Sequence, residues 1–424
     1  MSGPGERSEG LFRLGEPLVA ELVRKVRGGE PDAEADAEAF ARIAWTVLVE
    51  PGDAAAGAFI AAVGAPRALE AVLEDAREVA VGAWLADGVD RRRAEREVAS
   101  SFERWRLRVS SRSVVRAIEQ AARLGIGVAL PDDPWWPPGF AALGPTAPIA
   151  LWLRGDAALL AALGSSIAVV GARAATGYGE HVATELAGGL AERGIGVVSG
   201  GAYGIDAAAH RAALASDGFT AAFLAGGLDR LYPAGNDQLL SRVAEQGILL
   251  AEVPVGVPPT RQRFLSRNRM LAASTAATVV VEAGYRSGSL NTAHHALEAG
   301  RPLGVVPGPI TSPTSAGCHR LLRETEARCI TSVDDVVELA GGERSDAPPS
   351  FERLDAVAMR VVDELGVRRG RAAEEIARSS GLTLGEVLAA LGPLELDGYA
   401  RRVESGWVAG PMARRSVASG EGRR

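Results

Sequence analysis

Near-continuous apolar runs alternate with helical patterns through the middle of the chain, and this alternation restricts the fold more than any other feature. Between the runs, apolar residues recur at helical spacing, as at Val182, Leu186 and Leu190. Strands that are apolar on both faces and separated by helices form a parallel sheet that helices cover on both sides. The sequence therefore predicts a doubly wound α/β fold. Six strands are expected, at Ile167–Val170, Ile195–Val198, Thr220–Ala225, Ile248–Val253, Ala277–Ala283 and Pro302–Val306.

Changes in composition divide the rest of the chain. The N-terminal segment is polar and rich in Gly and Glu, and a helical stretch follows it. A segment rich in Gly, Ser and Pro marks a linker near residue 345. We expect a disordered N-terminus (1–35), a helical domain (36–127), the α/β domain (128–340), the linker (341–350), a small C-terminal domain (351–411) and a disordered tail (412–424).

The small C-terminal domain has the pattern of a winged helix. Three helical stretches, Leu354–Leu365, Ala373–Ser379 and Leu384–Leu396, precede a short hairpin. A helix that reads duplex DNA needs Arg, Lys, Asn or Gln on its exposed face, and the third stretch has none of them. We predict that this domain binds another protein or has a regulatory role. Only Arg401 and Arg402 are candidate DNA contacts there.

Net charge and cysteine usage limit the function classes. The formal net charge of −7 argues against a uniformly basic coat for nucleic acid, although a local basic patch stays possible. No apolar run has the length of a membrane span, and the N-terminus lacks the apolar segment of a signal peptide. Cys318 and Cys329 are then expected to be reduced thiols in the cytoplasm. His294 and His295 are adjacent and point apart, so we expect no metal site.

Three Gly- or Ser-rich loops, 171–179, 199–204 and 286–289, each follow an expected strand and lead into an expected helix. In an open parallel sheet, ligands bind outside the carboxyl ends of the strands. A helix N-terminus offers free N–H groups and a favourable dipole to an anion. Three such sites along one edge suit a ligand with several phosphates.

The loops do not carry the pattern of a dinucleotide site. The first loop, GARAATGYG, is not GxGxxG. The second strand should end in an acidic residue for the ribose, but it ends in Ser199-Gly200-Gly201. The sequence therefore argues against NAD or FAD.

RQRFLSRNRM, residues 261–270, concentrates four arginines on one expected helix. Arg263 and Arg267 are one helical turn apart. No carboxylate interleaves with these charges, so phosphate contact is favoured over a solvated charged face. Asp206 and His210 are also one turn apart, but no nucleophile accompanies them, so we expect both to be structural.

An ordered set of motifs gives the central domain a specific resemblance. It resembles the DNA-processing protein A (DprA/Smf) family, whose N-terminal SAM-like or helix-hairpin-helix region and winged helix also have counterparts here. The motifs that carry the resemblance are IAVVGAR (167–173), SGGAYGIDAAAH (199–210), GGLDRLYPAGN (226–236), FLSRNRM (264–270), VVVEAGYRSGSLNTA (279–293), VPGPI (306–310) and GCHRLL (317–322).

The resemblance implies an extended Rossmann-like fold without a cofactor or enzymatic activity. It implies a homodimer that protects single-stranded DNA and loads the RecA recombinase onto it, as in natural transformation. Together with the loops and the arginine run, it predicts a DNA-binding set: Gly171, Ala172, Arg173, Thr176, Gly177, Ser199, Gly200, Gly201, Tyr203, Gly204, Arg263, Arg267, Asn268, Arg269, Arg286, Ser287, Gly288 and Ser289.

This sequence departs from the family pattern at several positions. Tyr203 and Ala234 stand where the family often has a basic residue, and Ala172 replaces a serine. The loss of two cations lowers the expected DNA affinity, unless Arg261 and Arg263 compensate. Tyr203 could instead stack on a base, which contributes about 1–3 kcal/mol where it occurs.

The alternative function is a Rossmann-like enzyme that acts on nucleotides, such as a nucleoside-monophosphate phosphoribohydrolase. Enzymes of that class have similar Gly-rich anion loops, but they carry a PGGxGTxxE signature that supplies the catalytic acid. The corresponding region here lacks this signature and retains Glu282 as a lone carboxylate at a strand end. Its ordinary role would be to cap or pair locally.

Overall fold

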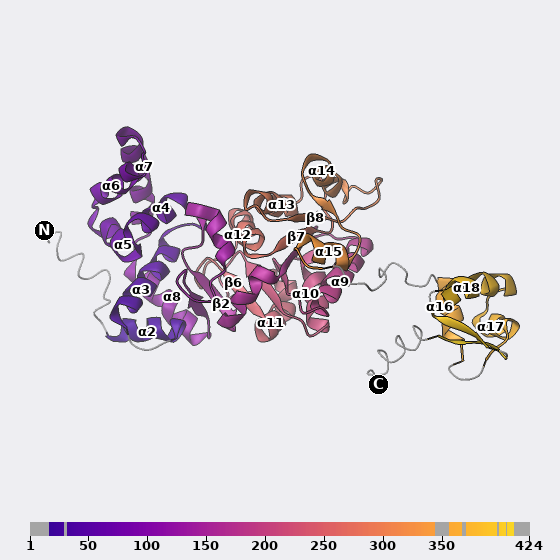
Figure 1. Cartoon of the computed structure of the whole chain (residues 1–424). Coiled ribbons are helices and arrows are strands. Elements are labelled where there is room, and N and C mark those ends of the chain that lie inside the picture. Colours follow the sequence, from indigo (N-terminus) through magenta and orange to yellow (C-terminus); the bar gives the residue numbers. More distant parts are fainter. Residues whose placement is uncertain are drawn as a thin grey trace. The chain divides into compact units, whose positions relative to one another are not determined.

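The computed structural model describes residues 17–28, 32–343, 356–366, 370–396, 398–403 and 405–410 (Figure 1). The chain forms two compact units, Met1–Ser345 and Asp346–Arg424, which are treated separately below. The expected tail and most of the expected linker lie outside the described residues, as does the start of the expected disordered N-terminus. No single helix among the described residues is long and apolar enough to span a membrane.

Among the described residues, seven helices precede the sheet, and most begin at a residue that caps them. Asp32, Asp53, Asp90 and Ser110 each accept hydrogen bonds from backbone N–H groups in the first turn of the helix that follows. The helices are α2 (Pro17–Arg27), α3 (Ala33–Leu48), α4 (Ala54–Val63), α5 (Ala65–Glu74), α6 (Arg77–Ala86), α7 (Arg91–Arg106) and α8 (Ser111–Arg123).

Helix α2 corrects the expectation of disorder over residues 1–35. Val19, Val23 and Val26 recur at helical spacing and are all buried. The polar residues that surround them concealed this pattern in the sequence.

The larger unit contains a nine-stranded sheet in the order β1-β2-β6-β5-β4-β3-β7-β8-β9. Each neighbouring pair from β6 to β9 along this order, which includes β5, β4, β3, β7 and β8, is parallel. At the other edge, β2 pairs antiparallel with both β1 and β6. The six predicted strands are confirmed, with ends that shift by up to three residues. The bounds are β1 (Gly127–Ala129), β2 (Leu151–Gly155), β3 (Ile167–Val170), β4 (Val197–Ser199), β5 (Thr220–Leu224), β6 (Ile248–Ala251), β7 (Ala277–Val280), β8 (Leu303–Val305) and β9 (Arg328–Cys329).

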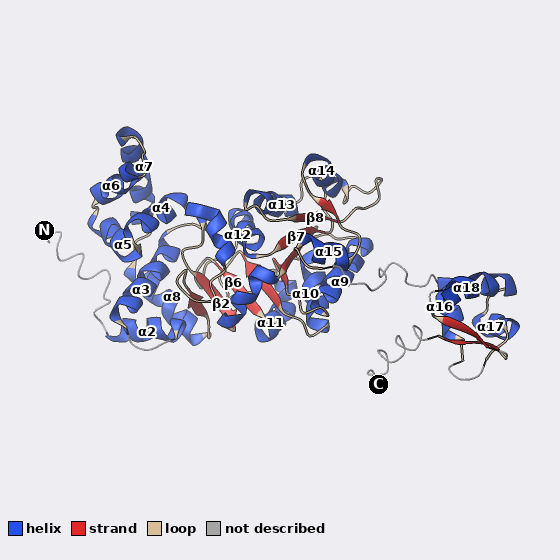
Figure 2. Ribbon diagram, in the orientation of Figure 1, coloured by secondary structure: helices blue, strands red, loops and turns tan. Residues whose placement is uncertain are grey.

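Helices cover both faces of the sheet (Figure 2), as the apolar strands predict. In β3, Ile167 and Val169 join a core with α9, α10 and α15, whereas Ala168 and Val170 join a second core with α12, α13 and α14. The helices are α9 (Gly177–Ala191), α10 (Ile205–Ala215), α11 (Asp237–Gln246), α12 (Arg261–Ser274), α13 (Ser289–Glu298), α14 (Ala316–Glu324) and α15 (Val333–Leu339), with the 3₁₀ segments η1 (Pro138–Thr146), η2 (Ala157–Ser165) and η3 (Ala234–Asn236).

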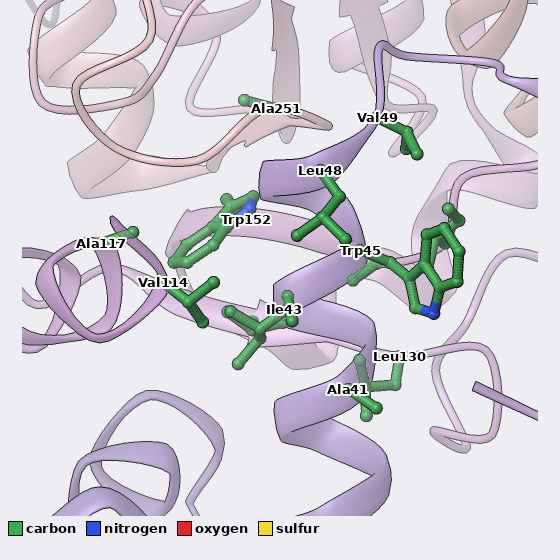
Figure 3. Close-up of a cluster of buried hydrophobic side chains, with 14 of the residues drawn as sticks. Ala41, Ile43, Trp45, Leu48, Val49, Val114, Ala117, Leu130, Trp152 and Ala251 are labelled. Carbon is green, nitrogen blue, oxygen red and sulfur yellow. The ribbon is translucent and has the colours of Figure 1, made fainter. Parts of the chain in front are cut away.

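The N-terminal helices share a hydrophobic core with the antiparallel edge of the sheet. Trp45 and Leu48 of α3 lie in the same buried cluster as Trp152 of β2 and Ala251 of β6 (Figure 3). The Trp152 indole N–H also donates to the Thr46 hydroxyl at 3.3 Å. This region therefore packs as an extension of the α/β domain.

The second unit is a winged helix with its own small core. Helices α16 (Ala356–Asp363), α17 (Ala373–Ser380) and α18 (Leu384–Leu396) precede the antiparallel pair β10 (Ala400–Val403) and β11 (Gly406–Ala409). Buried apolar residues from all three helices and both strands form this core. The predicted topology is confirmed.

Candidate nucleic-acid interface

A groove opens where the strand order reverses. From β3 the chain moves to β4 on one side, and it later returns to pair β7 with β3 on the other side. Ligand sites of doubly wound sheets lie at the carboxyl ends of the strands beside such a point. The groove has a volume of about 960 Å³. Nine predicted residues line it: Gly171, Ala172, Arg173, Arg267, Asn268, Arg286, Ser287, Gly288 and Ser289.

Three exposed arginines surround this groove. Arg173 follows β3, Arg261 begins α12, and Arg286 precedes α13. None of them forms an ion pair with a residue that the structure describes. Their charges are therefore available to an anionic ligand.

An aromatic pair lines the groove beside these charges. The Phe264 ring lies 4.7 Å from the Arg173 guanidinium, within range of a cation–π interaction. Tyr232, whose ring centroid is 5.8 Å from that of Phe264, is also exposed to the groove. Neither aromatic residue was in the predicted set. Aromatic residues close to arginines in RLYP (230–233) and RQRFLSR (261–267) are the signal that could have identified them.

Two N–H groups of the second Gly-rich loop are not free, contrary to the prediction. The Gly200 and Ala202 N–H groups donate to one carboxylate oxygen of Asp206, at 3.1 and 3.3 Å. Burial raises the pKa of Asp206, although nearby Arg267 and these N–H groups act in the opposite direction. Asp206 is thus structural, as expected, and it occupies the position that the prediction gave to a phosphate.

A second internal carboxylate fills the N-terminus of α9. Glu282 accepts hydrogen bonds from the Thr176 N–H and hydroxyl, both at 2.9 Å, and from the Thr314 hydroxyl at 2.6 Å. Only 2% of Glu282 is exposed. A side chain at Gly179 would overlap this carboxylate, so the glycine permits its approach. The expected local partner is therefore wrong, because Glu282 bonds to residues 106 and 32 positions away in sequence. Thr176 is removed from the set of free donors.

The third loop remains open to the groove. Ser287, Gly288 and Ser289 line it at the start of α13, where no side chain caps the helix. The Ser287 and Ser289 hydroxyl oxygens are 2.7 Å apart. Of the three predicted anion sites, this is the one that no carboxylate of the described residues occupies.

Arg267 lines the groove but is held from within the protein. It is buried and donates to the Gly200 carbonyl at 2.8 Å and to the Phe223 carbonyl. Burial lowers the pKa of Arg267 to about 10, with Asp206 opposing the shift and Arg173 adding to it. The side chain stays charged at neutral pH and anchors the second loop to β5.

Arg263 and Arg269 lie outside the groove, contrary to the prediction. Arg269 forms a buried two-point ion pair with Glu252, at 2.6 and 2.8 Å. Arg263 pairs with Glu50 at 2.9 and 3.0 Å. The partners are 17 and 213 residues away in sequence, so the absence of interleaved carboxylates did not indicate free charges.

The remaining predicted residues support the loops and do not line the groove. The Ser199 hydroxyl donates to the Val169 carbonyl, and the Tyr203 hydroxyl accepts from the Gly235 N–H. Gly204 has a φ of +73°. A side chain there would also come within 2.6 Å of the Arg173 carbonyl. Gly177 begins α9, and Gly201 lies in the second loop with a φ of +70°.

Comparisons with known proteins agree with this architecture. Residues 127–341 match the family described as DNA recombination-mediator protein A, and residues 345–406 match the DprA winged helix domain. A putative DNA processing protein DprA of Mycobacterium tuberculosis is 50% identical over 306 residues, which cover 68% of this chain and 78% of that protein. Protein Smf of Escherichia coli is 37% identical over 287 residues, covering 65% and 75%. The crystal structure of DNA processing protein A from Streptococcus pneumoniae superposes with a TM-score of 0.55 at 28% identity, covering 71% of this chain and 97% of that one.

Proposed function

Because the chain belongs to the DNA recombination-mediator protein A family, we propose that it binds single-stranded DNA in the groove beside β3 and β7. One observation carries this assignment to the groove. Arg173, Arg261 and Arg286 are exposed around it and are not neutralised by any described carboxylate. Guanidinium groups suit the phosphates of a polynucleotide.

The aromatic lining favours a single strand over a duplex. Tyr232 and Phe264 can stack on bases only where those bases are not paired and stacked within a helix. Arginines that contact phosphates carry no information about sequence. We therefore expect little preference among sequences of single-stranded DNA.

The protein binds the strand without breaking a bond in this proposal. The Asp206 and Glu282 carboxylates contact the loops, and both are engaged by N–H or hydroxyl donors. A general acid or base must instead reach a reacting atom. These contacts support binding over the nucleotide-hydrolase alternative.

The proposal includes the partners that family membership suggests. The bound strand is protected and passed to the RecA recombinase, as in natural transformation, by a homodimer in the cytoplasm. Family membership supports this part of the proposal.

Fluorescence anisotropy of a labelled oligo-dT across a salt series tests the site. We compare the wild-type protein with Arg173→Ala and Arg286→Ala, and with Arg242→Ala on the exposed surface of α11 as the matched control. Each groove substitution should weaken binding and make the log–log salt dependence about 0.7 less steep. The control should match the wild type. Binding that is indifferent to salt, or equal in all four proteins, would contradict the proposed site.

A further inference from the structure

A basic surface on the N-terminal helices lies beside the start of α12. Arg108, in the turn between α7 and α8, donates to Glu50 at 2.8 Å, and Arg263 of α12 donates to the same carboxylate. One negative charge thus faces two positive charges. Burial alone would raise the pKa of Glu50, but the hydrogen bonds from Arg263 and Arg108 outweigh it and hold this pKa below its usual value. The cluster of Glu50, Arg108 and Arg263 therefore has a net positive charge. Its Arg263 is two residues from Arg261, which lines the groove.

Helix α8 continues this positive charge along its exposed face. Arg112 and Arg116 are one turn apart and exposed, and neither forms an ion pair within the described part of the chain. One turn further on, the Gln120 Oε1 atom lies 4.0 Å from the point that a Cβ of Gly256 would occupy. Gly256 belongs to the connection between β6 and α12, whose last residues line the groove.

Two carboxylates of the described residues on this side of the molecule contact groups other than Arg112 and Arg116. Glu119 of α8 pairs with Arg123. Asp229 accepts a hydrogen bond from the Gly256 N–H at 2.8 Å, and the exposed Arg230 follows it directly. The positive charge therefore extends from the rim of the groove, past the β6–α12 connection, to the face of α8.

We propose that Arg108, Arg112 and Arg116, which we call the α8 track, bind the phosphates of single-stranded DNA where the strand leaves the groove. This inference rests on the proposed function, because it requires a strand in the groove. Arg112 and Arg116 have no ion pair among the described residues, and Arg108 shares the single Glu50 carboxylate with Arg263. Such arginines attract a polyanion through its phosphates and the release of its counterions. The track lengthens the site on the protein without adding sequence preference.

Oligonucleotides of two lengths test the track. Labelled oligo-dT of about 6 and about 30 nucleotides is titrated in a salt series, because single-strand sites in OB-folds span roughly 4–16 nucleotides and the two lengths lie near and beyond the ends of that range. The variant is Arg112→Ala/Arg116→Ala, which leaves the Glu50 cluster intact. The matched control is Arg92→Ala/Arg96→Ala on α7, where two exposed arginines have the same spacing.

The proposal expects the α8 variant to bind the short oligonucleotide as the wild type does. It should bind the long oligonucleotide roughly tenfold more weakly, with a salt dependence about 1.4 less steep, because two phosphate contacts are lost. An unchanged affinity for the long oligonucleotide, or an equal loss in the α7 control, would overturn the track while leaving the groove in place. A wild-type protein that binds neither length would overturn the proposed function itself.

Discussion

Replacing Arg269 by alanine should lower folding stability, whereas replacing Arg173 by alanine should leave it nearly unchanged. Arg269→Ala leaves the Glu252 carboxylate buried without its partner. Removing one member of a buried ion pair costs about 3–5 kcal/mol of folding free energy. Arg173→Ala removes an exposed side chain and should leave stability within roughly 0.5 kcal/mol of wild type. Urea unfolding curves followed by circular dichroism compare the two, and equal stabilities would show that the Glu252 pair does not support the fold.

Gly204 is required by the approach of the first loop to the second. Gly204→Ala places a side chain at a φ of +73° and against the Ala172 and Arg173 carbonyls. Strain of this kind costs about 1–3 kcal/mol, and the overlap adds to it. Gly177→Ala is the matched control, because no atom lies within 4 Å of its Cβ position. Thermal melting should show a lower midpoint for Gly204→Ala alone, and a shared decrease would count against this explanation.

The sequence located the groove residues better than it assigned their roles. Glycines after strands predicted the loops, because a close approach of two backbones requires them. The same pattern could not show that Asp206 and Glu282 return to fill two of the predicted anion sites. Likewise, the run of arginines on α12 was visible, but its carboxylate partners come from distant segments. Burial and pairing depend on tertiary contacts, which residue spacing does not contain.

At the scale of one element, α10 carries a buried histidine that resists protonation. His210 Nδ1 is 2.8 Å from the Thr220 hydroxyl, which itself donates to the Val197 carbonyl. Nδ1 therefore carries the hydrogen, and the buried Nε2 has no hydrogen-bond partner among the residues that the structure describes. Burial lowers the pKa of His210 from 6.5 to about 3, and the charges of Arg267 and Arg211 add to this shift.

This histidine makes folding stability depend on pH. Below about pH 6.5 the unfolded chain takes up a proton that the folded protein does not bind. The stabilising contribution is therefore complete above pH 6.5 and is lost as the pH falls toward 3. The slope approaches about 1.4 kcal/mol per pH unit for one proton. His210→Asn, unfolded in urea between pH 7 and pH 4, should show a smaller slope than wild type, and identical slopes would contradict this account.

Helix α18 presents an acidic and apolar surface where a DNA-reading helix would be basic. Leu384 and Leu388 are exposed one turn apart, and the charged residues of the helix are the exposed Glu386 and Glu395. We expect a protein comprising residues 346–424 to show no specific shift of a labelled duplex at physiological salt, because base edges in the major groove require polar donors and acceptors. Tight, sequence-specific binding would show that the wing, with Arg401 and Arg402, suffices for recognition.

Long apolar strands and their helices could be predicted, whereas short edge elements could not. β3 and β5 to β8 are near-continuous apolar runs. In contrast, β1 and β2 pair antiparallel at one edge, outside the alternation of strands and helices, and β9 has two exposed residues, so the alternation did not reveal them. These strands form because a neighbouring strand is already present. The predicted winged helix is confirmed for a related reason, since its helices are amphipathic and locally connected.

At the scale of the whole molecule, the groove and the α8 track belong entirely to the larger unit. A chain that ends at Ser345 should therefore bind oligo-dT with the affinity and the salt dependence of the full chain. Anisotropy titrations of the two proteins in parallel make the comparison. A marked loss on truncation would place DNA contacts in the winged helix.

The N-terminal helices were predicted as a domain of their own, but they share buried residues with the sheet. Trp152 of β2 packs among α3 residues, and Gly52, between α3 and α4, donates its N–H to Glu252 at 3.3 Å. The sequence shows a change from helical to strand-like patterns near residue 127. It does not show whether the apolar faces of the helices before residue 127 pack against the strands after it.

The carboxylates of Asp206 and Glu282 also influence which molecules can compete for the groove. A single phosphate in solution gains most from a helix N-terminus that is empty, and two such positions here are already satisfied by the protein itself. A mononucleotide or inorganic phosphate is left with one loop and a few separated arginines. A polymer reaches all of those arginines at once, and each contact after the first is made at high effective concentration. The internal carboxylates thus weaken the binding of mononucleotides to the groove relative to the binding of a DNA strand.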